Sequence, residues 1–277
     1  MMEPTSSQND DDQLANSKRT LSRINGLVNE MTMQQIIDKL KQLDVSTNGE
    51  DNVLKQRLKG VMREKVYKNS NIKSSKFSTD YYCVIDFEAT CEEVNPRKYK
   101  HEIIEFPALM VNARTLAVES QFHFYCRPVM NPKLSSFCTK LTGIDQKTID
   151  SADVFKVVFQ NFQKWLEDVL GESTFVVVTD GPFDITRFLT IQCKVDKIPM
   201  PYWASNWTNL KRTFKAFYKL SGQRFPTLQD MLGALKIPHD GRLHSGIDDA
   251  KNIAKILCQL IRDGCQVKPN EILANYS

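Results

Sequence analysis

Residues 82–90 read YCVIDFEAT, an apolar run that ends in two acidic residues, Asp86 and Glu88. The length of the run and its β-branched and aromatic residues favour a central strand of a sheet. Because side chains alternate along a strand, the two carboxylates lie on the same side, close enough to repel each other. The segment contains no Lys or Arg. It therefore favours a divalent metal with oxygen ligands, Mg²⁺ or Mn²⁺, and the alternative is a solvated strand end with two exposed acids.

Two further acidic residues lie where predicted elements begin. Asp184 opens a helix after a strand and a glycine-proline turn, and Asp249 falls in the first turn of the last helix, five residues after His244. Taken singly, each acid could merely cap its helix. With Asp86 and Glu88 they form a set that α/β topology can gather at one sheet edge, as two-metal phosphodiester hydrolysis requires. In such a site His244 could take the proton of the attacking water.

The hydrophobic pattern from residue 81 onward predicts an α/β fold. Three β-rich runs followed by alternating strands and helices indicate a mixed sheet with helices on both faces. The predicted strands are 81–87, 103–111, 120–126 and 174–178, and the predicted helices are 152–170, 184–193, 228–235 and 248–262.

The 277 residues accommodate one catalytic domain of ~200 residues and a small accessory module. We expect a disordered polar tail at 1–24, a helical module at 25–66, a flexible basic linker at 67–79 and the catalytic domain at 80–270. Thr32 is the predicted N-cap of the first helix of the module.

Positive charge is concentrated in one part of the chain. The net charge is only +4, but residues 55–76 contain eight basic residues against one acid, Glu64. This stripe fits a polyanion, and the alternative is a solvated helix face that runs into a linker.

Several classes of protein are excluded. A composition of 41% hydrophobic and 25% charged residues does not fit a disordered chain, and no apolar run approaches the ~20 residues of a membrane span. The seven cysteines are scattered, which supports neither a disulfide framework nor a zinc ribbon. The chain has no Walker loop, GxSxG elbow or nucleophilic cysteine dyad, so hydrolysis without a covalent intermediate remains.

Five motifs follow one another in order: IDFEATCE at 85–92, HEIIEFP at 101–107, LTGI at 141–144, IQC at 191–193 and GRLHSGIDDAKNIA at 241–254. Over roughly residues 80–270 they resemble the DEDDh exonuclease superfamily, which has an RNase H-like fold. The similarity is greatest to the three-prime histone mRNA exonucleases, also called enhanced-RNAi exoribonucleases.

The resemblance implies roles for particular residues. Two Mg²⁺ ions, for which Mn²⁺ is a substitute, would be held by Asp86, Glu88, Asp184 and Asp249. Glu88 and His244 would be catalytic, with His244 as the general base. Asp184 matches the family's metal ligand better than Asp180, and Asp249 better than Asp248. The implied substrate-binding residues are Glu88, Ala89, Leu141, Thr142, Gly143, Ile144 and His244.

The family can also carry an N-terminal SAP domain, a small helical module that binds nucleic acid, and residues 43–58 resemble one. Where SAP domains often have lysines after the turn glycine, this chain has Glu50 and Asp51, which repel phosphate. We therefore expect the RNA contacts of the module to come from the basic residues Lys55, Arg57, Lys59 and Arg63.

The resemblance implies a Mg²⁺-dependent 3′-to-5′ exoribonuclease that releases nucleoside 5′-monophosphates from RNA 3′ ends. The implied substrates are the histone mRNA stem-loop, the 3′ end of 5.8S ribosomal RNA and small-RNA duplex overhangs, with a role in the regulation of RNA silencing. Ribosomal or RNA-silencing proteins are the implied partners, and we expect no membrane association and a cytoplasmic and nuclear or nucleolar location. Two alternatives stay open: a DNA-directed exonuclease of the same superfamily, and an RNA-binding adaptor with a vestigial nuclease site.

Overall fold

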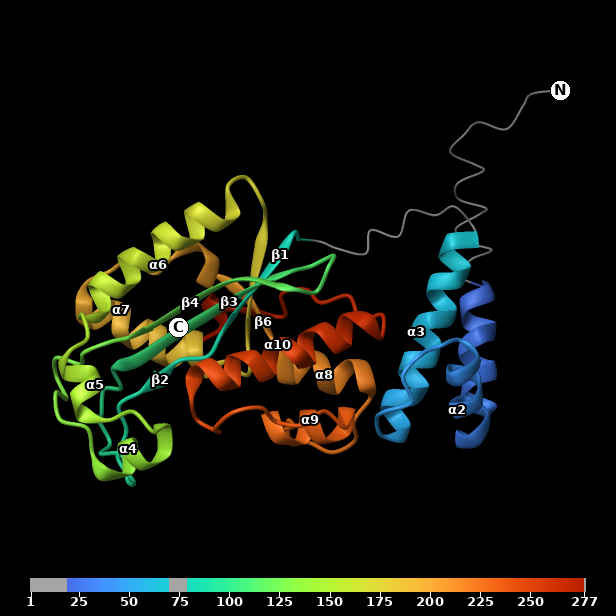
Figure 1. The fold of residues 1–277 in the computed structure, drawn as a ribbon, viewed down its shortest axis with the longest axis horizontal. Coiled ribbons are helices and arrows are strands. Elements are labelled where there is room, and N and C mark those ends of the chain that lie inside the picture. The colour runs from blue at the N-terminus through green and yellow to red at the C-terminus, as the bar shows by residue number, and fades with distance from the viewer. Residues whose placement is uncertain (1–18, 70–78, 277) are drawn as a thin grey trace.

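The computed structural model describes residues 19–69 and 79–276, and these form a mixed sheet flanked by helices next to a small helical module (Figure 1). The sheet has the order β2-β3-β1-β5-β6-β7, and β4 also pairs with β3. β1 lies inside the sheet, as predicted for a central strand, and it pairs antiparallel with β3 and parallel with β5. The described strands are β1 (Tyr81–Ile85), β2 (Glu88–Ala89), β3 (Ile103–Asn112), β4 (Val118–Tyr125), β5 (Phe175–Thr179), β6 (Asn206–Asn209) and β7 (Glu271–Ile272).

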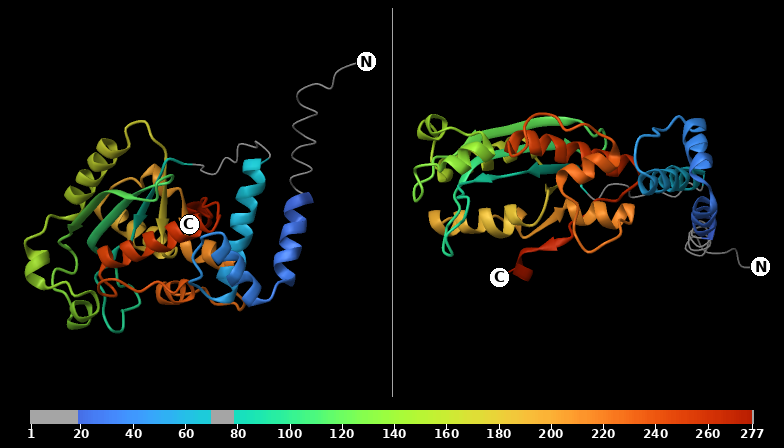
Figure 2. Two further views of the ribbon diagram at one scale, coloured as in Figure 1. Left: turned by 45° about the vertical axis from the view of Figure 1, so that its right-hand side comes forward. Right: turned by 90° about the horizontal axis from the view of Figure 1, so that it is seen from below.

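Alternate residues of β1 belong to two hydrophobic cores, one on each face of the sheet. Tyr82 and Val84 pack with residues of α8, α9 and α10. Cys83 and Ile85 pack with residues of α6, η1 and α7 on the opposite face. Figure 2 shows α6 and α10 on opposite sides of the strands. This three-layer arrangement confirms the predicted α/β fold. These helices are α6 (Phe155–Leu170), η1 (Asp184–Leu189), α7 (Thr190–Asp196), α8 (Leu210–Tyr218), α9 (Leu228–Leu235) and α10 (Gly246–Arg262).

Shorter elements complete the domain. α4 and α5 lie at the end of the sheet near β2 (Figure 1). The short elements are α4 (Ser136–Thr142), α5 (Gln146–Asp150), η2 (Tyr202–Ala204) and η3 (Leu273–Tyr276). Within residues 19–69 and 79–276, no helix combines the length and the apolar character needed to cross a bilayer.

The N-terminal module consists of a helical segment at residues 19–30, α2 (Met33–Gln42) and α3 (Asp51–Asn69). Thr32 caps α2 in a capping box with Gln35, as predicted for this N-cap. The prediction of a disordered tail is wrong for residues 19–24, which are helical because this segment packs Val28 into the core of the module. The predicted linker is likewise helical up to residue 69, while residues 1–18 and 70–78 lie outside the described structure.

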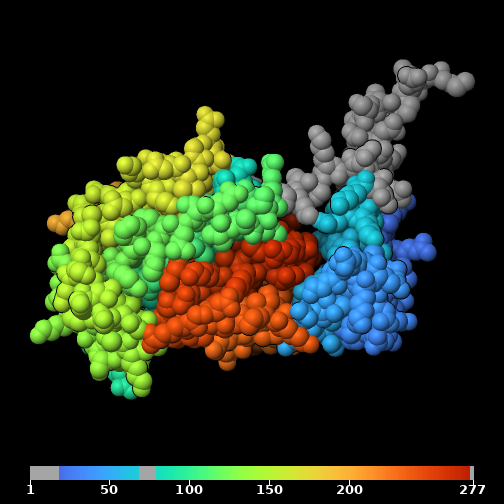
Figure 3. All heavy atoms as spheres, viewed as in Figure 1, coloured from blue at the N-terminus to red at the C-terminus, as the bar shows by residue number. Residues whose placement is uncertain are grey.

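The module is packed directly against the α/β domain. Val53 of α3 belongs to the same hydrophobic core as α8, α9 and α10, and the Glu50 N–H donates to the Ala234 carbonyl at 2.8 Å. A side chain at Gly60 would collide with the backbone of Asp263, so glycine allows the two parts to approach closely. Figure 3 shows the atoms of the module against those of the C-terminal helices.

Candidate active site

β1 and β2 behave as one strand interrupted at Asp86 and Phe87. The pairing register of β1 with β3 is kept across the interruption as far as Glu88, which pairs with Glu105, and shifts by one residue at Ala89. The Phe87 N–H donates instead to Oδ1 of Asp184, at 2.9 Å. Since the residue spacing along the strand is kept, Asp86 and Glu88 line one cavity, as predicted from their alternation.

Asp184 comes from the segment after β5. The chain turns through Gly181 and Pro182 and enters η1, a π-helical segment that begins with Asp184. π-helical turns are rare and occur frequently at functional sites. The side chain is buried between β1 and η1, where its hydrogen bond to the Phe87 N–H fixes its direction.

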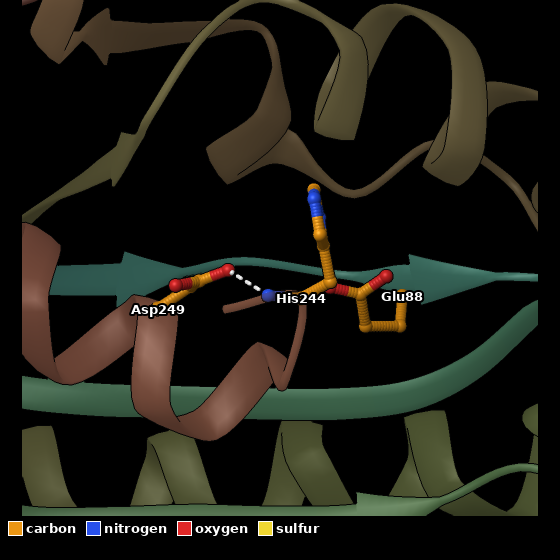
Figure 4. Close-up of side chains that lie close together, drawn as sticks. All are labelled: Glu88, His244 and Asp249. Carbon is orange, nitrogen blue, oxygen red and sulfur yellow. Dashed lines mark hydrogen bonds between the residues drawn. The ribbon is translucent and has the colours of Figure 1, made fainter. Parts of the chain in front are cut away.

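The loop before α10 positions His244 and Asp249. His244 has φ of 61°, a left-handed conformation that is uncommon for a residue other than glycine. Its backbone N–H donates to Oδ2 of Asp249 at 2.8 Å, and Nε2 of His239 lies 3.3 Å from Oδ1. In Figure 4 the imidazole of His244 extends away from this backbone hydrogen bond, between Glu88 and Asp249. The ring is exposed and can therefore meet a substrate.

Glu105 of β3 holds the start of α10. Its carboxylate is only 1% exposed and accepts from the Gly246 N–H at 2.9 Å and the Ile247 N–H at 3.1 Å, with Nε2 of His123 at 2.8 Å. It thus supplies the cap that the N-cap residue of α10 does not provide. A Cβ atom at Gly246 would lie 2.8 Å from the Asp86 carbonyl oxygen, so this close approach requires glycine.

These elements surround a cavity of about 810 Å³, a volume in the range of small-molecule sites. Ligand atoms of Glu88, His244 and Asp249 lie within 4.8 Å of one another. The structure therefore brings together all of the predicted metal-binding and catalytic residues. Those that line the cavity are Asp86, Glu88, Asp184, His244 and Asp249.

The carboxylates of the cluster are strongly perturbed. Burial, followed by the charges of Asp184 and Glu88, raises the pKa of Asp86 well above its ordinary value. Burial, followed by the charge of Glu105, does the same to the pKa of Glu88. Burial raises the pKa of Asp184 to about 7 and also raises that of Asp249. Burial and mutual repulsion thus favour the protonated forms of these carboxylates, and bound cations would favour their ionised forms.

The donor set fits divalent cations. Lys211 is the one Lys or Arg side chain among the described residues that line the cavity, and it forms an ion pair with Asp180. Within the described ranges, Asp86 and Asp184 form no ion pair with a Lys or Arg. Their oxygen donors, with those of Glu88, match the preference of Mg²⁺ and Mn²⁺. Asp180 thus has a cationic partner in Lys211, whereas Asp184, the metal ligand that the resemblance implies, forms no such ion pair within the described residues.

The predicted substrate-binding residues divide into two groups. Ala89 and Leu141 line the cavity together with Glu88 and His244. The remaining three do not line it. Thr142 and Ile144 are buried, and the Thr142 hydroxyl donates to the Cys138 carbonyl. Gly143 has φ of 79° and ends α4 in contact with Arg242. Their role in substrate binding stays a prediction, since Thr142 is the last residue of α4, Gly143 is its exposed C-cap and Ile144 follows the helix.

The predicted RNA-binding residues of the module are largely engaged within the protein. Arg57 is 2% exposed, and its guanidinium donates to both carboxylate oxygens of Asp263, at 2.7 and 3.1 Å. Lys59 is 6% exposed and bonds to Asn29. As surface contacts for RNA, these two predictions are wrong, since both side chains are buried. Lys55 and Arg63 are partly exposed, and Arg63 lies 3.4 Å from the Gly264 carbonyl.

Sequence reasoning missed several residues of the site. Glu105 and His239 contact the motif that carries His244 and Asp249, and Lys211 lines the cavity. The HEIIEFP motif contains Glu105, but its hydrogen-bond partners are about 140 residues away in the sequence. Neither local spacing nor charge pattern indicates such a partner.

Known proteins resemble this chain over most of its length. Residues 83–257 match the RNase_T family model, described as Exonuclease. The 3′-5′ exoribonuclease 1 of Rattus norvegicus is 40% identical over 259 residues, which cover 92% of this chain and 74% of the rat protein.

Two solved structures are similar in fold and sequence. One is the nuclease domain of 3′hExo, a DEDDh family member, bound to rAMP, with 42% identity, a TM-score of 0.67 and coverage of 70% of this chain and 98% of that one. The other structure describes 3′-end specific recognition of histone mRNA stem-loop by 3′-exonuclease. It has 37% sequence identity and a TM-score of 0.68, and the match covers 92% of this chain and 89% of that one.

Proposed function

Because the chain belongs to this exonuclease family and is a DEDDh-type 3′-5′ exoribonuclease, we propose that it uses two Mg²⁺ ions to remove nucleoside 5′-monophosphates from RNA 3′ ends. The observation that carries the proposal is the convergence of buried carboxylates with raised pKa and an exposed histidine on one cavity.

In this proposal the residues of the cavity have distinct roles. Asp86, Glu88, Asp184 and Asp249 would hold the divalent ions, and the bound ions would supply activation of water and stabilisation of negative charge. His244 accepts the proton of the attacking water, because its imidazole is exposed at the cavity. The Asp249 carboxylate fixes the backbone of His244 and so holds the base next to the site.

The substrates that we propose are structured RNAs with accessible 3′ ends. A similar protein was solved in recognition of the histone mRNA stem-loop, which supports this RNA as a substrate. The family resemblance extends the proposal to the 3′ end of 5.8S ribosomal RNA and to small-RNA duplex overhangs, and thereby to the regulation of RNA silencing. We also propose a cytoplasmic and nuclear location, which imaging of the tagged protein would test.

The test is digestion of 5′-labelled RNA by the wild-type protein and by the Asp86→Ala variant. Stem-loop, duplex with overhang and single-stranded RNA would be compared with DNA of the same sequence, in Mg²⁺ or in EDTA. We expect progressive shortening from the 3′ end in Mg²⁺ only. Asp86→Ala should reduce turnover by roughly three orders of magnitude or more while RNA binding is largely retained.

Each alternative gives a different result in this assay. Faster digestion of DNA than of RNA would indicate a DNA-directed exonuclease. Tight RNA binding without any digestion, in both the wild-type protein and the variant, would indicate an adaptor with a vestigial site.

A further inference from the structure

Exposed aromatic side chains are few, and two of them line the catalytic cavity. Among the described residues, the strongly exposed aromatic side chains are Phe124, Phe183, Tyr202 and Phe225. Phe183 and Phe225 belong to the cavity lining, Phe183 directly before η1 and Phe225 between α8 and α9. Phe225 is 47% exposed, although a phenyl ring gains free energy from burial.

Two side chains anchor the loop that carries Phe225. Nζ of Lys215, on α8, donates to the carbonyls of Gly222, Gln223 and Arg224 at 2.6, 3.1 and 3.3 Å. The Arg224 guanidinium lies 3.3 Å from the carboxylate of Asp230 in the first turn of α9.

Beyond Phe225, the chain enters α9 directly. Pro226 is buried, and Thr227 caps α9 in a capping box with Asp230. The conformation of the loop is therefore set before any ligand binds, which lowers the entropy cost of using the ring for recognition.

One face of the Phe225 ring is already occupied. Nζ of Lys215 lies over the ring, 5.1 Å from its centroid, in a cation–π contact. The exposed remainder of the ring borders the cavity that also contains Lys211 and His244. An apolar flat surface at the rim of an acidic cavity suits a ligand with a π face rather than a phosphate or a cation.

From this geometry we propose that Phe225 is a stacking platform for a nucleobase of the RNA 3′ end. The proposal rests on the proposed function, and it adds a binding residue that the sequence motifs do not contain. Because every base has a π face, this contact contributes affinity without selecting a particular base. Lys215 acts as a positioning residue, since it touches the loop and the ring rather than the substrate.

The experiment compares the wild-type protein with Phe225→Ala, Phe225→Tyr and Phe124→Ala. Phe124 is the matched control, because it is also 47% exposed but does not line the cavity. The affinity for single-stranded RNA would be measured by fluorescence anisotropy in EDTA, and KM and kcat in Mg²⁺. We expect Phe225→Ala to weaken binding and raise KM by about tenfold, with little change in kcat. Phe225→Tyr and Phe124→Ala should behave like the wild-type protein, and circular dichroism would verify that all variants fold.

A second measurement tests stacking itself. RNAs with an abasic site at the last, second-last or third-last position would be bound to the wild-type protein and to Phe225→Ala. If Phe225 stacks on one base, the difference between the two proteins disappears for one of these RNAs. An unchanged affinity of Phe225→Ala for intact RNA, or a loss that persists for all three abasic RNAs, would overturn the proposal. A wild-type protein that neither binds nor degrades RNA would instead refute the proposed function, and the stacking platform with it.

Discussion

Glu105 is positioned to influence the reaction without touching the substrate. Its carboxylate binds the first two N–H groups of α10, the helix that carries Asp249, and its negative charge lies at the positive end of that helix. Glu105→Gln removes this charge and one of the two acceptor oxygens. We expect Mn²⁺ affinity and turnover to fall by 10- to 100-fold, as for other partners that orient metal ligands. Calorimetric titration with Mn²⁺ and steady-state kinetics would measure the two effects.

Glu102→Gln is the matched control for this variant. Glu102 is also 1% exposed and also accepts from backbone N–H groups, but these belong to the loop of Val129, Met130 and Asn131. Its replacement should lower stability without a specific change in Mn²⁺ affinity. Equal losses of Mn²⁺ affinity in both variants would contradict the positioning role of Glu105.

At the level of single residues, the sequence indicates what lies within a few positions along the chain. The alternation rule places Asp86 and Glu88 together because their separation is fixed by strand geometry. Local spacing does not predict whether a charged side chain is buried, since burial depends on partners that are distant in the sequence. Arg57 therefore resembles a surface cation in the sequence, although its partner Asp263 is 206 residues away. For the same reason Phe225 cannot be recognised without the cavity that it borders.

The convergence of several elements on the acidic cavity makes stability depend on pH when metal is absent. Burial raises the pKa of Asp184 to about 7, against an ordinary value of 3.8, and raises those of Asp86 and Glu88. The metal-free folded state thus keeps protons that the unfolded chain releases. Its stability is highest at acidic pH and falls as the pH rises toward 7, by at most about 1.4 kcal/mol per pH unit for each such group.

Thermal melts in EDTA and in saturating Mn²⁺, from pH 5 to pH 8, would test this dependence. We expect the two melting temperatures to diverge as the pH rises, because the bound cation stabilises the ionised carboxylates. Asp184→Asn should reduce the decrease of the melting temperature with rising pH in EDTA, since it removes one of the titrating groups. If the melting temperature decreased equally with and without Mn²⁺ as the pH rises, the pH dependence would arise outside the cavity.

At the level of elements, long apolar runs were easier to predict than short ones. β1, β3, β5 and α9 lie close to their predicted positions, because each has several consecutive or periodic buried residues. β2 and β6, with two and four residues, are too short to produce a pattern and exist because neighbouring strands provide hydrogen bonds.

For the whole molecule, the main difference from the sequence-based expectation is the docking of the N-terminal module. The charge pattern of α3 suggests a tethered module with a free basic face. In the structure, the Arg57–Asp263 ion pair is buried, and Asp263 also accepts from the Tyr218 hydroxyl at 2.8 Å. Together with the shared core around Val53, this pair makes the module part of the enzyme. RNA bound by the module would then have a fixed position relative to the catalytic cavity.

Arg57→Met tests this arrangement, because it leaves the Asp263 carboxylate buried without its counterion. We expect a loss of about 3–5 kcal/mol in the free energy of unfolding, with partial recovery in the double variant Arg57→Met/Asp263→Leu. The control is Arg224→Met, which breaks a pair whose side chains are 77% and 56% exposed, and it should cost about 1 kcal/mol or less.

The salt dependence of RNA binding provides an independent measurement. If Arg57 neutralised an RNA phosphate, the double variant would lose about 0.7–0.9 from the slope of log affinity against log salt. We expect the double variant to keep the wild-type slope, because its buried ion pair is replaced without removing a surface charge. Lys55→Gln, which removes a partly exposed charge from the same helix, should reduce the slope if the module binds RNA.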